Sequence, residues 1–331
     1  MMRPFDYARP DSLDQAVKLL AGTPGEAVVL AGGTDLLATM KDGAMTPARL
    51  VSLDAIDGLA AIEETRDGGL RIGARVTLAQ LLDNTRLVKA YPGIAQAAAG
   101  ITSPQIRNRG TVGGDLCQRP RCWYFRNGYG LLALREGRSM VVDGDNRYHA
   151  IFGNDGPAAF VSASSLAPVL AASQASVQVT GPDGPRSLPV VELFRIPRAD
   201  GERELSLAPA EIVTAVTLPP AEGRQSSTYE VRQRLAMDWP LVAASAVLTM
   251  DGDIVEAARI VMGHVAPVPW PAPDGVGRFL RGKPVVARTA EVAAEQAVVG
   301  ARALSHNDYK IRLARVCVKR ALLRAAGEAV V

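Results

Sequence analysis

The chain has 331 residues, of which 48% are hydrophobic and 21% charged, and its formal net charge is +3. These values are typical of a globular protein of two or three domains. So small a net charge predicts no strong attraction to nucleic acid or to an anionic membrane. No apolar run reaches the roughly 18 residues of a membrane span, and the first residues lack a signal-peptide pattern, so we expect the cytoplasm. Three cysteines, an odd number, favour reduced thiols over a disulfide framework.

Helix and strand signals alternate through the first 220 residues. Ser12 and Thr77 are candidate N-caps, because each precedes a helical apolar face. The predicted helices lie at 13–20, at 78–82 and at 93–100, with a short one beginning at 35–37. The predicted strands lie at 27–30, 49–53, 70–73, 159–161, 177–179, 187–190 and 211–216. Asp-Gly pairs at 67–69 and at 181–184 predict hairpin turns.

A second α+β unit follows residues 219–223, whose prolines and glycine make this the best candidate linker. Strand-like segments at 227–231, 240–248 and 254–261 come first. Two helices are then predicted, at 290–304 and at 308–326. The sequence thus predicts an α+β protein with a larger domain at 1–222 and a smaller one at 223–331.

Two glycine-bearing loops carry the strongest functional signal. The first loop is residues 30–36, LAGGTDL, directly after a buried strand, and the second is residues 105–115, QIRNRGTVGGD. Paired glycines beside Thr and Asp expose backbone N–H groups that can turn toward a phosphate. Two such loops fit a dinucleotide gripped from both sides. The rival fingerprint GxGxxG is not met, because no third glycine opens a helix.

The same loops carry a resemblance. The segments LAGGTDLLATMK and SPQIRNRGTVGGDL resemble the two FAD-pyrophosphate loops of the flavoprotein subunit of molybdenum hydroxylases, and SSLAPVL and RQRLAMDWPLVAASAVL extend the likeness. That family includes xanthine dehydrogenase, carbon monoxide dehydrogenase and aldehyde oxidoreductases. The resemblance implies a two-subdomain FAD-binding domain of the p-cresol methylhydroxylase and vanillyl-alcohol oxidase type, followed by a smaller α+β C-terminal domain.

The resemblance also implies a set of residues that bind FAD without a covalent bond. These residues are Leu30, Ala31, Gly32, Gly33, Thr34, Asp35, Leu36, Ser103, Ile106, Asn108, Gly110, Thr111, Gly113, Gly114, Asp115, Ser165 and Leu166. Because carboxylates repel phosphate, we expect Asp35 and Asp115 to accept backbone or ribityl hydroxyl hydrogen bonds that order the loops. Ser165 stands where many relatives have an aspartate, so a weaker hydroxyl contact is expected there.

Residues 117–154 lose clear periodicity and are predicted to be an ordered insertion. Cys117 and Cys122 lie in a region where some relatives hold an extra iron–sulfur cluster. Such a cluster needs four thiolates, and this chain has three cysteines, one of them far away at Cys317. We therefore expect no cluster here and interpret the insertion as a relic held by its aromatic residues. A zinc site that uses His149 is a weak alternative, and no metal site is predicted.

The other polar candidates favour structural roles. His264 and His306 have no nucleophile or carboxylate at a recognisable spacing. Basic residues of the last helix favour a solvated face, with a partner-subunit contact as the second reading. These residues are Lys310, Arg312, Arg315, Lys319 and Arg320.

The function predicted from the resemblance is electron transfer. A large partner subunit would hold the molybdenum cofactor, a small one the 2Fe–2S clusters, and FAD on this chain would pass electrons to an external acceptor. No catalytic acid or base is then required of this chain. The alternatives are a free-standing FAD-dependent oxidase, which would need such a base, and a scaffold subunit that has lost its flavin.

Overall fold

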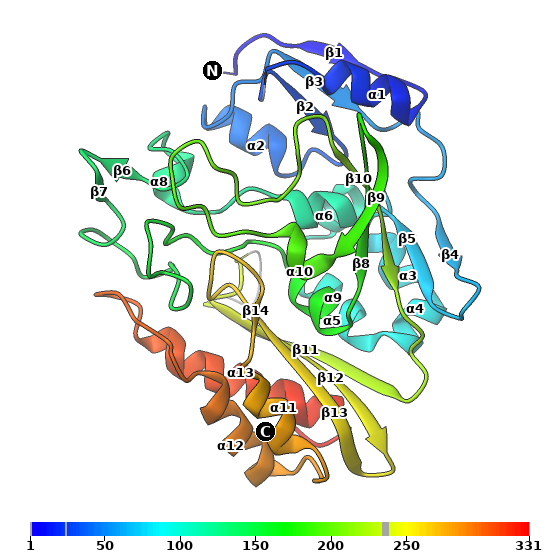
Figure 1. Ribbon diagram of the computed structural model, residues 1–331, viewed down its shortest axis with the longest axis vertical. Helices are drawn as coiled ribbons and strands as arrows, with labels where there is room; N and C mark the ends of the chain where they lie inside the picture. Colours follow the sequence, from blue (N-terminus) through cyan, green and yellow to red (C-terminus); the bar gives the residue numbers. More distant parts are fainter. Residues whose placement is uncertain (1, 24, 234–237, 331) are drawn as a thin grey trace.

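The computed structural model describes residues 2–23, 25–233 and 238–330. Three larger sheets, each with its own helices, follow one another from the top to the bottom of Figure 1, and a two-stranded sheet lies at its left. Residues 234–237 of the segment RQRLAMDWPLVAASAVL lie outside the described residues. Within the described ranges, no helix is long and apolar enough to cross a membrane.

The first sheet is parallel, with the order β1-β3-β2 (Figure 1). Its elements in chain order are β1 (Asp6–Ala8), α1 (Leu13–Leu20), β2 (Ala27–Leu30), α2 (Leu36–Lys41) and β3 (Arg49–Ser52). The Ser12 side chain accepts a hydrogen bond from the Gln15 N–H, so the predicted cap of α1 is confirmed. The buried face of α1 packs on β3 through a small apolar core. Because β2 ends at Leu30, the first loop (residues 30–36) lies at the end of this sheet.

The central sheet is antiparallel, with the order β4-β5-β10-β8-β9. Its strands are β4 (Ile62–Glu64), β5 (Leu70–Gly73), β8 (Ser176–Gly181), β9 (Gly184–Pro189) and β10 (Ile212–Leu218). Both predicted hairpins are confirmed. β10 is the last strand of this sheet in the sequence, but it lies in the middle, between β5 and β8.

Short helices cover one side of the central sheet and enclose the largest apolar core. They are α3 (Leu78–Asp83), α4 (Thr85–Ala90), α5 (Pro92–Gly100), α6 (Pro104–Arg109), α7 (Val112–Cys117), α9 (Ala167–Ala172) and α10 (Val190–Leu193). Thr77 and Gln80 form a capping box at the start of α3, which confirms the predicted cap. The predicted helix at 93–100 is confirmed as α5.

The insertion contains little regular structure, as predicted. Its elements are α8 (Trp123–Arg126), β6 (Leu134–Arg135) and β7 (Arg138–Ser139), at the left of Figure 1. The predicted strand at 159–161 is wrong. That segment makes separate backbone bonds instead, from Ala150 N–H to Ala159 C=O at 2.8 Å and from Ser162 N–H to Ala266 C=O at 2.8 Å. It lies between the insertion and the C-terminal domain, not in a sheet.

The C-terminal domain is an antiparallel sheet backed by helices, with an apolar core between them. Its elements are β11 (Arg224–Val231), β12 (Val242–Asp251), β13 (Ile254–Gly263), β14 (Trp270–Pro271), α11 (Asp274–Leu280), α12 (Ala287–Ala297) and α13 (Tyr309–Ala325). The helix predicted at 290–304 ends early, at Ala297, and residues 298–300 form a turn in which Gly300 takes a positive φ of 86°. The following residues bind the insertion, with Arg302 N–H donating to Ile151 C=O at 2.7 Å.

The reading of the last helix as a solvated face is wrong at Lys310. This side chain is 1% exposed, and its ammonium donates to the carbonyl oxygens of Tyr148, His149 and His264 at 3.2, 3.0 and 2.7 Å. Burial lowers the pKa of Lys310 to about 7. One buried side chain thus joins α13 to the insertion and to the residue after β13. Arg312 and Arg315 are exposed, as predicted.

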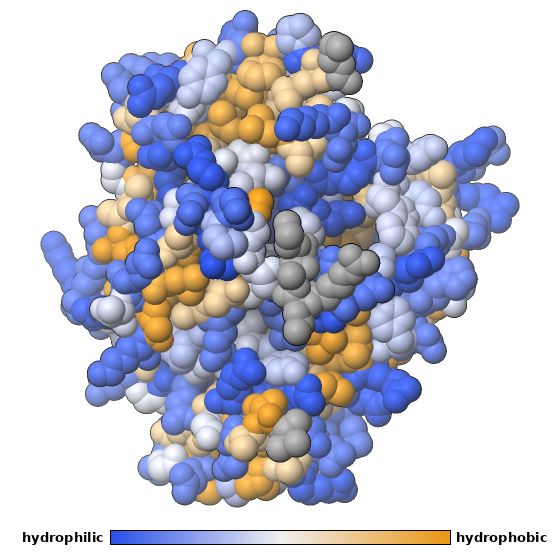
Figure 2. All heavy atoms as spheres, turned by 180° about the vertical axis from the view of Figure 1, so that it is seen from behind, coloured by the Kyte–Doolittle hydropathy of each residue, from blue (hydrophilic) through white to orange (hydrophobic). Residues whose placement is uncertain are grey.

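The face opposite to that of Figure 1 has several separate hydrophobic patches among hydrophilic residues (Figure 2). This distribution is usual for folded chains, whose surfaces keep much apolar area.

Replacement of Lys310 tests its role in joining the insertion to the C-terminal domain. Lys310→Met should lower the free energy of unfolding by about 2–4 kcal/mol, because three buried carbonyls lose their donor. Lys319→Met, on a partly exposed side of the same helix, is the control and should change stability little. Urea denaturation measures both variants, and equal stability of the two would contradict the assignment.

Candidate cofactor site

The two glycine loops lie against each other. A Cβ built on Gly32 would stand 1.8 Å from the carbonyl oxygen of Arg109, so only glycine permits this approach. A Cβ on Gly110 would lie 3.6 Å from the Thr34 hydroxyl, on the other side of the same contact. Glycine is also favoured at Gly33, whose φ is +76°. The loop that follows β2 and the turn after the helical residues Pro104–Arg109 therefore lie in direct backbone contact.

The first loop offers unpaired donors on this surface. Among the described residues, the backbone N–H groups of Gly33, Thr34 and Asp35 have no hydrogen-bond acceptor. Buried or half-buried N–H groups without an acceptor are costly unless a ligand or water accepts them. A phosphate is a fitting acceptor, because several N–H dipoles then point toward one negative group. This observation agrees with the predicted role of the loop.

Much of the second loop is helical. Ser103 caps α6 by accepting from Ile106 N–H at 3.3 Å, and Thr111 caps α7 by accepting from Gly114 N–H at 3.1 Å. Gly113 N–H donates to the Ala74 carbonyl at 2.8 Å, and its Cα packs closely against Ala74. The amide of Gly113 therefore bonds within the fold.

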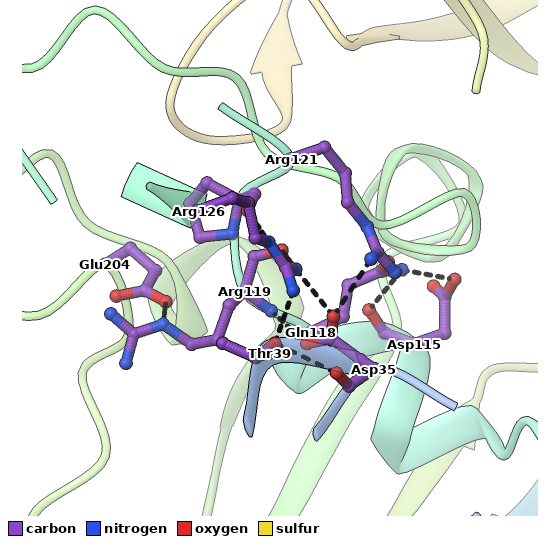
Figure 3. A network of polar contacts seen from close by, with 9 residues as sticks. Asp35, Thr39, Asp115, Gln118, Arg119, Arg121, Arg126 and Glu204 are labelled. Atoms are coloured by element: carbon purple, nitrogen blue, oxygen red, sulfur yellow. Dashed lines mark hydrogen bonds and ion pairs between the residues drawn. The ribbon is translucent and has the colours of Figure 1, made fainter. Parts of the chain in front are cut away.

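The Asp35 carboxylate joins the first loop to the insertion (Figure 3). Its carboxylate accepts from Arg119 N–H at 2.7 Å and from the Arg126 guanidinium at 2.7 Å. The Arg121 guanidinium lies 3.2 Å away as a third positive partner, and Arg126 also donates to Thr39. The expectation that Asp35 accepts a backbone hydrogen bond is thus confirmed. The partners come from the insertion, so two guanidinium groups offset the negative charge beside the first loop.

Asp115 orders the other wall of the site. Its carboxylate accepts from the Ser165 and Leu166 N–H groups at 3.3 and 3.0 Å, and from Ser164 and Gln118 side chains. Burial raises the pKa of Asp115, and these hydrogen bonds oppose that rise. The predicted backbone-accepting role is confirmed. The Leu166 amide is hydrogen-bonded within the protein, to Asp115.

These walls enclose a cavity of about 240 Å³, the main groove. Of the predicted residues, it is lined by Thr34, Asp35, Ser103, Ile106, Gly110, Thr111, Gly114, Asp115 and Ser165. The other predicted residues do not line it; they are Leu30, Ala31, Gly32, Gly33, Leu36, Asn108, Gly113 and Leu166. Arg232, Asp238 and Trp239 of the C-terminal domain also line the groove.

Sequence reasoning missed the arginines of the insertion. Arg119 forms a buried ion pair with Glu204 at 2.6 Å, and burial lowers the pKa of Arg121 to about 10. Arg121 also stacks over Trp239, with 4.0 Å from its guanidinium carbon to the ring centroid. The insertion is held by arginines as well as by aromatic residues. The only sign of them in the sequence is that three arginines fall within eight residues, 119–126.

Cys122 and His149 meet within the insertion, with 3.2 Å between Sγ and Nε2. Burial raises the thiol pKa, and burial together with Lys310 lowers the His149 pKa to about 4. The pair is therefore neutral and not an activated thiolate. Across the described ranges, no group of three or more His, Cys, Asp or Glu side chains is placed to hold a metal ion.

Family models and known proteins match this chain over nearly its whole length. The family model for the FAD binding domain in molybdopterin dehydrogenase matches residues 3–221, and that for the CO dehydrogenase flavoprotein C-terminal domain matches residues 227–325. The aldehyde oxidoreductase FAD-binding subunit PaoB of Escherichia coli K12 is 30% identical over 331 residues, covering 99% of this chain and 100% of that protein. The carbon monoxide dehydrogenase medium chain of Afipia carboxidovorans is 29% identical over 329 residues, 98% of each chain.

Solved structures agree with these matches. A Cu,Mo-CO dehydrogenase in its cyanide-inactivated form gives a TM-score of 0.78 at 26% identity, covering 99% of this chain and 100% of that one. Quinoline 2-oxidoreductase from Pseudomonas putida 86 gives 0.76 at 25% identity, with 99% and 98% covered.

The fold and the paired loops define an FAD-binding oxidoreductase subunit. More particularly, the chain belongs to the FAD-binding subunits of the molybdenum hydroxylase family. The predicted α+β fold, an FAD-binding domain followed by a C-terminal domain, is confirmed.

The contact between the loops can be tested at Gly32. Gly32→Ala places a methyl group where the Arg109 carbonyl stands, so the loops must separate and the N–H groups lose their common direction. Each lost charge-assisted hydrogen bond costs about 1.5–3 kcal/mol, so FAD content should fall roughly tenfold or more. The control is Gly275→Ala, a helical site with open space around it. Flavin absorbance per folded chain is the measurement, and full occupancy in Gly32→Ala would falsify the role of the contact.

The buried His149 predicts a dependence of stability on pH. Its folded pKa of about 4 lies below the ordinary 6.5, so between these values the unfolded chain binds a proton that the folded chain does not. This stabilisation is complete above pH 6.5 and is lost as the pH falls to about 4, a loss on the order of 2–3 kcal/mol. His149→Gln should lose less stability than the wild type between pH 7 and 4.5, as measured by urea midpoints. Equal losses in both proteins would contradict the assignment.

Proposed function

We propose that this chain holds one FAD in the main groove and carries electrons between a partner's redox centres and an external acceptor. The observation that carries this proposal is the pair of amides on Thr34 and Asp35, which line the groove, have no acceptor among the described residues and lie close to the Gly32–Arg109 contact. When bound, FAD supplies the two-electron chemistry. The chain supplies donors for the pyrophosphate and a shaped groove.

The residues of the groove divide this work. We propose that the first loop and the start of α7 contact the pyrophosphate, with the hydroxyls of Thr34 and Thr111 nearby. Asp35 and Asp115 hold the loops in place and do not act as acids or bases on an organic substrate. Trp239 and Arg232 also line the groove and offer an aromatic and a cationic surface to the flavin.

We also propose the partners and the compartment. Full-length relatives are named as medium chains or subunits of complexes, such as the carbon monoxide dehydrogenase medium chain and the nicotine 6-hydroxylase medium subunit of Paenarthrobacter nicotinovorans. By analogy, this chain would join a large subunit with the molybdenum cofactor and a small subunit with 2Fe–2S clusters. The three free cysteines suit a reducing cytoplasm. We assign the FAD-binding domain to 1–222 and the C-terminal domain to 223–331.

The purified chain should contain FAD in about equimolar amount, bound without a covalent bond. Among the predicted binding residues there is no His or Cys that could tether the flavin. Acid precipitation should therefore release a yellow chromophore that chromatography identifies as FAD. Colour retained in the pellet, or release of FMN, would sink the proposal.

The spectrum also separates the other functions. Bleaching of the flavin by an organic substrate in the isolated chain indicates a free-standing oxidase. A colourless chain that still assembles with its partners indicates a scaffold subunit. Bleaching only in the assembled complex supports electron transfer.

A further inference from the structure

A buried ion pair adjoins the main groove. Glu230, in β11, and Arg232, just after this strand, form the pair, and their side chains are 10% and 8% exposed. Arg232 lines the groove, whereas Glu230 does not. The Glu230 carboxylate is therefore linked to a ligand in the groove through the guanidinium group of Arg232.

The pair is closely packed and only partly hydrogen-bonded. Gly100, the last residue of α5, lies so close that a Cβ on it would overlap the Glu230 carboxylate and stand 3.0 Å from Arg232 Nη2. The other carboxylate oxygen, Glu230 Oε1, is buried and has no hydrogen-bond donor among the described residues. A buried carboxylate that lacks donors is poorly stabilised as an anion, which favours its protonated form.

Arg232 and Asp115 are the charged groups that act on Glu230. Burial raises the pKa of the Glu230 carboxyl to about 7, although Arg232 opposes the rise, and the negative charge of Asp115 adds to it. Glu230 therefore exchanges a proton with the solvent near neutral pH.

The helices packed on β11 are α5 and α13. α5 has no ionisable residue, and α13 presents Cys317, whose thiol is neutral because burial raises its pKa. Arg320 and Arg324 of α13 stack on the ring of Tyr229. These helices therefore leave Arg232 as the cation that is paired with Glu230.

The main groove carries more negative than positive charge. Three acidic and two basic residues line it within the described ranges, namely Asp35, Asp115, Asp238, Arg121 and Arg232. Arg121 already lies 3.2 Å from Asp35, and Arg232 is paired with Glu230. A pyrophosphate brings further negative charge, so its binding is easier when one of the acidic groups becomes neutral.

Glu230 is the acidic group whose charge is easier to remove. Hydrogen bonds from several donors favour the charged forms of Asp35 and Asp115. Glu230 accepts from Arg232 alone in the part of the chain that the structure describes. Protonation of Glu230 therefore breaks fewer hydrogen bonds than protonation of either aspartate.

We propose that Glu230 takes up one proton when FAD enters the main groove. The proton comes from the solvent and binds the Glu230 carboxylate, which becomes neutral. The positive charge of Arg232 is then left to meet the negative charge of the cofactor. This inference rests on the proposed function, and Glu230 acts on FAD through Arg232 without touching it.

The direction of the pH effect follows from this proton uptake. A group that gains a proton on binding makes FAD bind more tightly at low pH and more weakly as the pH rises. With a pKa of about 7 before FAD binds, Glu230 is largely protonated at pH 6 and largely charged at pH 8. The dissociation constant of FAD should therefore rise between these pH values, by at most about tenfold for one proton.

The experiment measures the dissociation constant of FAD from the full chain at pH 6 and at pH 8. Dilution of the FAD-loaded chain releases free FAD, whose fluorescence reports the dissociation constant. In the wild type this constant should be about three- to tenfold larger at pH 8. Glu230→Gln imitates the protonated side chain, so it should bind FAD equally at both pH values and more tightly than the wild type at pH 8. A merely structural role of Glu230 predicts the opposite, weaker binding by the variant at both pH values.

Glu211→Gln is the matched control. Glu211 also pairs with an arginine, Arg186, at 2.6 Å, its side chain is likewise 10% exposed, and it does not line the groove. This variant should keep the pH dependence of the wild type. Titration calorimetry of the FAD-free chain in phosphate and in Tris, buffers with different heats of ionisation, counts the protons taken up.

Three results would overturn the inference and leave the proposed function intact. They are a wild-type dissociation constant that is equal at pH 6 and pH 8, a pH dependence that persists in Glu230→Gln, and weaker binding by Glu230→Gln at both pH values. If Glu230→Gln does not fold, the double variant Glu230→Gln with Arg232→Gln removes both charges and must likewise lose the pH dependence. A wild type that holds no FAD at either pH rejects the proposed function itself.

Discussion

The carboxylate of Asp35 is the constraint on which the site depends. It sits at the end of the first loop and receives a backbone N–H and two guanidinium groups from residues 119–126. A carboxylate beside a phosphate site is unfavourable unless positive groups offset its charge. The insertion supplies these groups, so it completes the electrostatics of the loop as well as one wall of the groove.

Apolar cores and polar junctions have different tasks in this chain. The apolar clusters extend between sheets: the cluster of the central sheet includes Val247 and Val261 of the C-terminal sheet, and that of the first sheet includes Ile212 of β10. Polar contacts also join parts that lie far apart in the sequence, such as Arg119 with Glu204 and Lys310 with three carbonyls. Hydrogen bonds depend strongly on distance and angle, whereas apolar contact tolerates sliding. The junctions therefore fix how the parts align around the groove.

Local pattern made much of the fold predictable. Caps such as Ser12 and Thr77, and the Asp-Gly hairpins, act over a few residues, so the sequence displays them directly. The site was predictable as two loops, but not as a contact: nothing near Gly32 in the sequence indicates that Arg109 lies against it. The burial of Lys310 was not predictable for the same reason. A lysine in a basic helix is expected to be exposed to solvent, and the three carbonyl oxygens that Lys310 binds lie 46 to 162 residues away in the sequence.

The last helix has a consequence for the order in which the protein is made. Residues 146–150 are bound by residues near 305–310: Asn146 by Ser305, and the carbonyls of His149 and Ala150 by Asn307. A growing chain lacks these partners until residues 305–310 have been made. The insertion and the histidines beside it can then reach their final positions only after residues 305–310 have emerged, so a finished groove cannot take up flavin before that point.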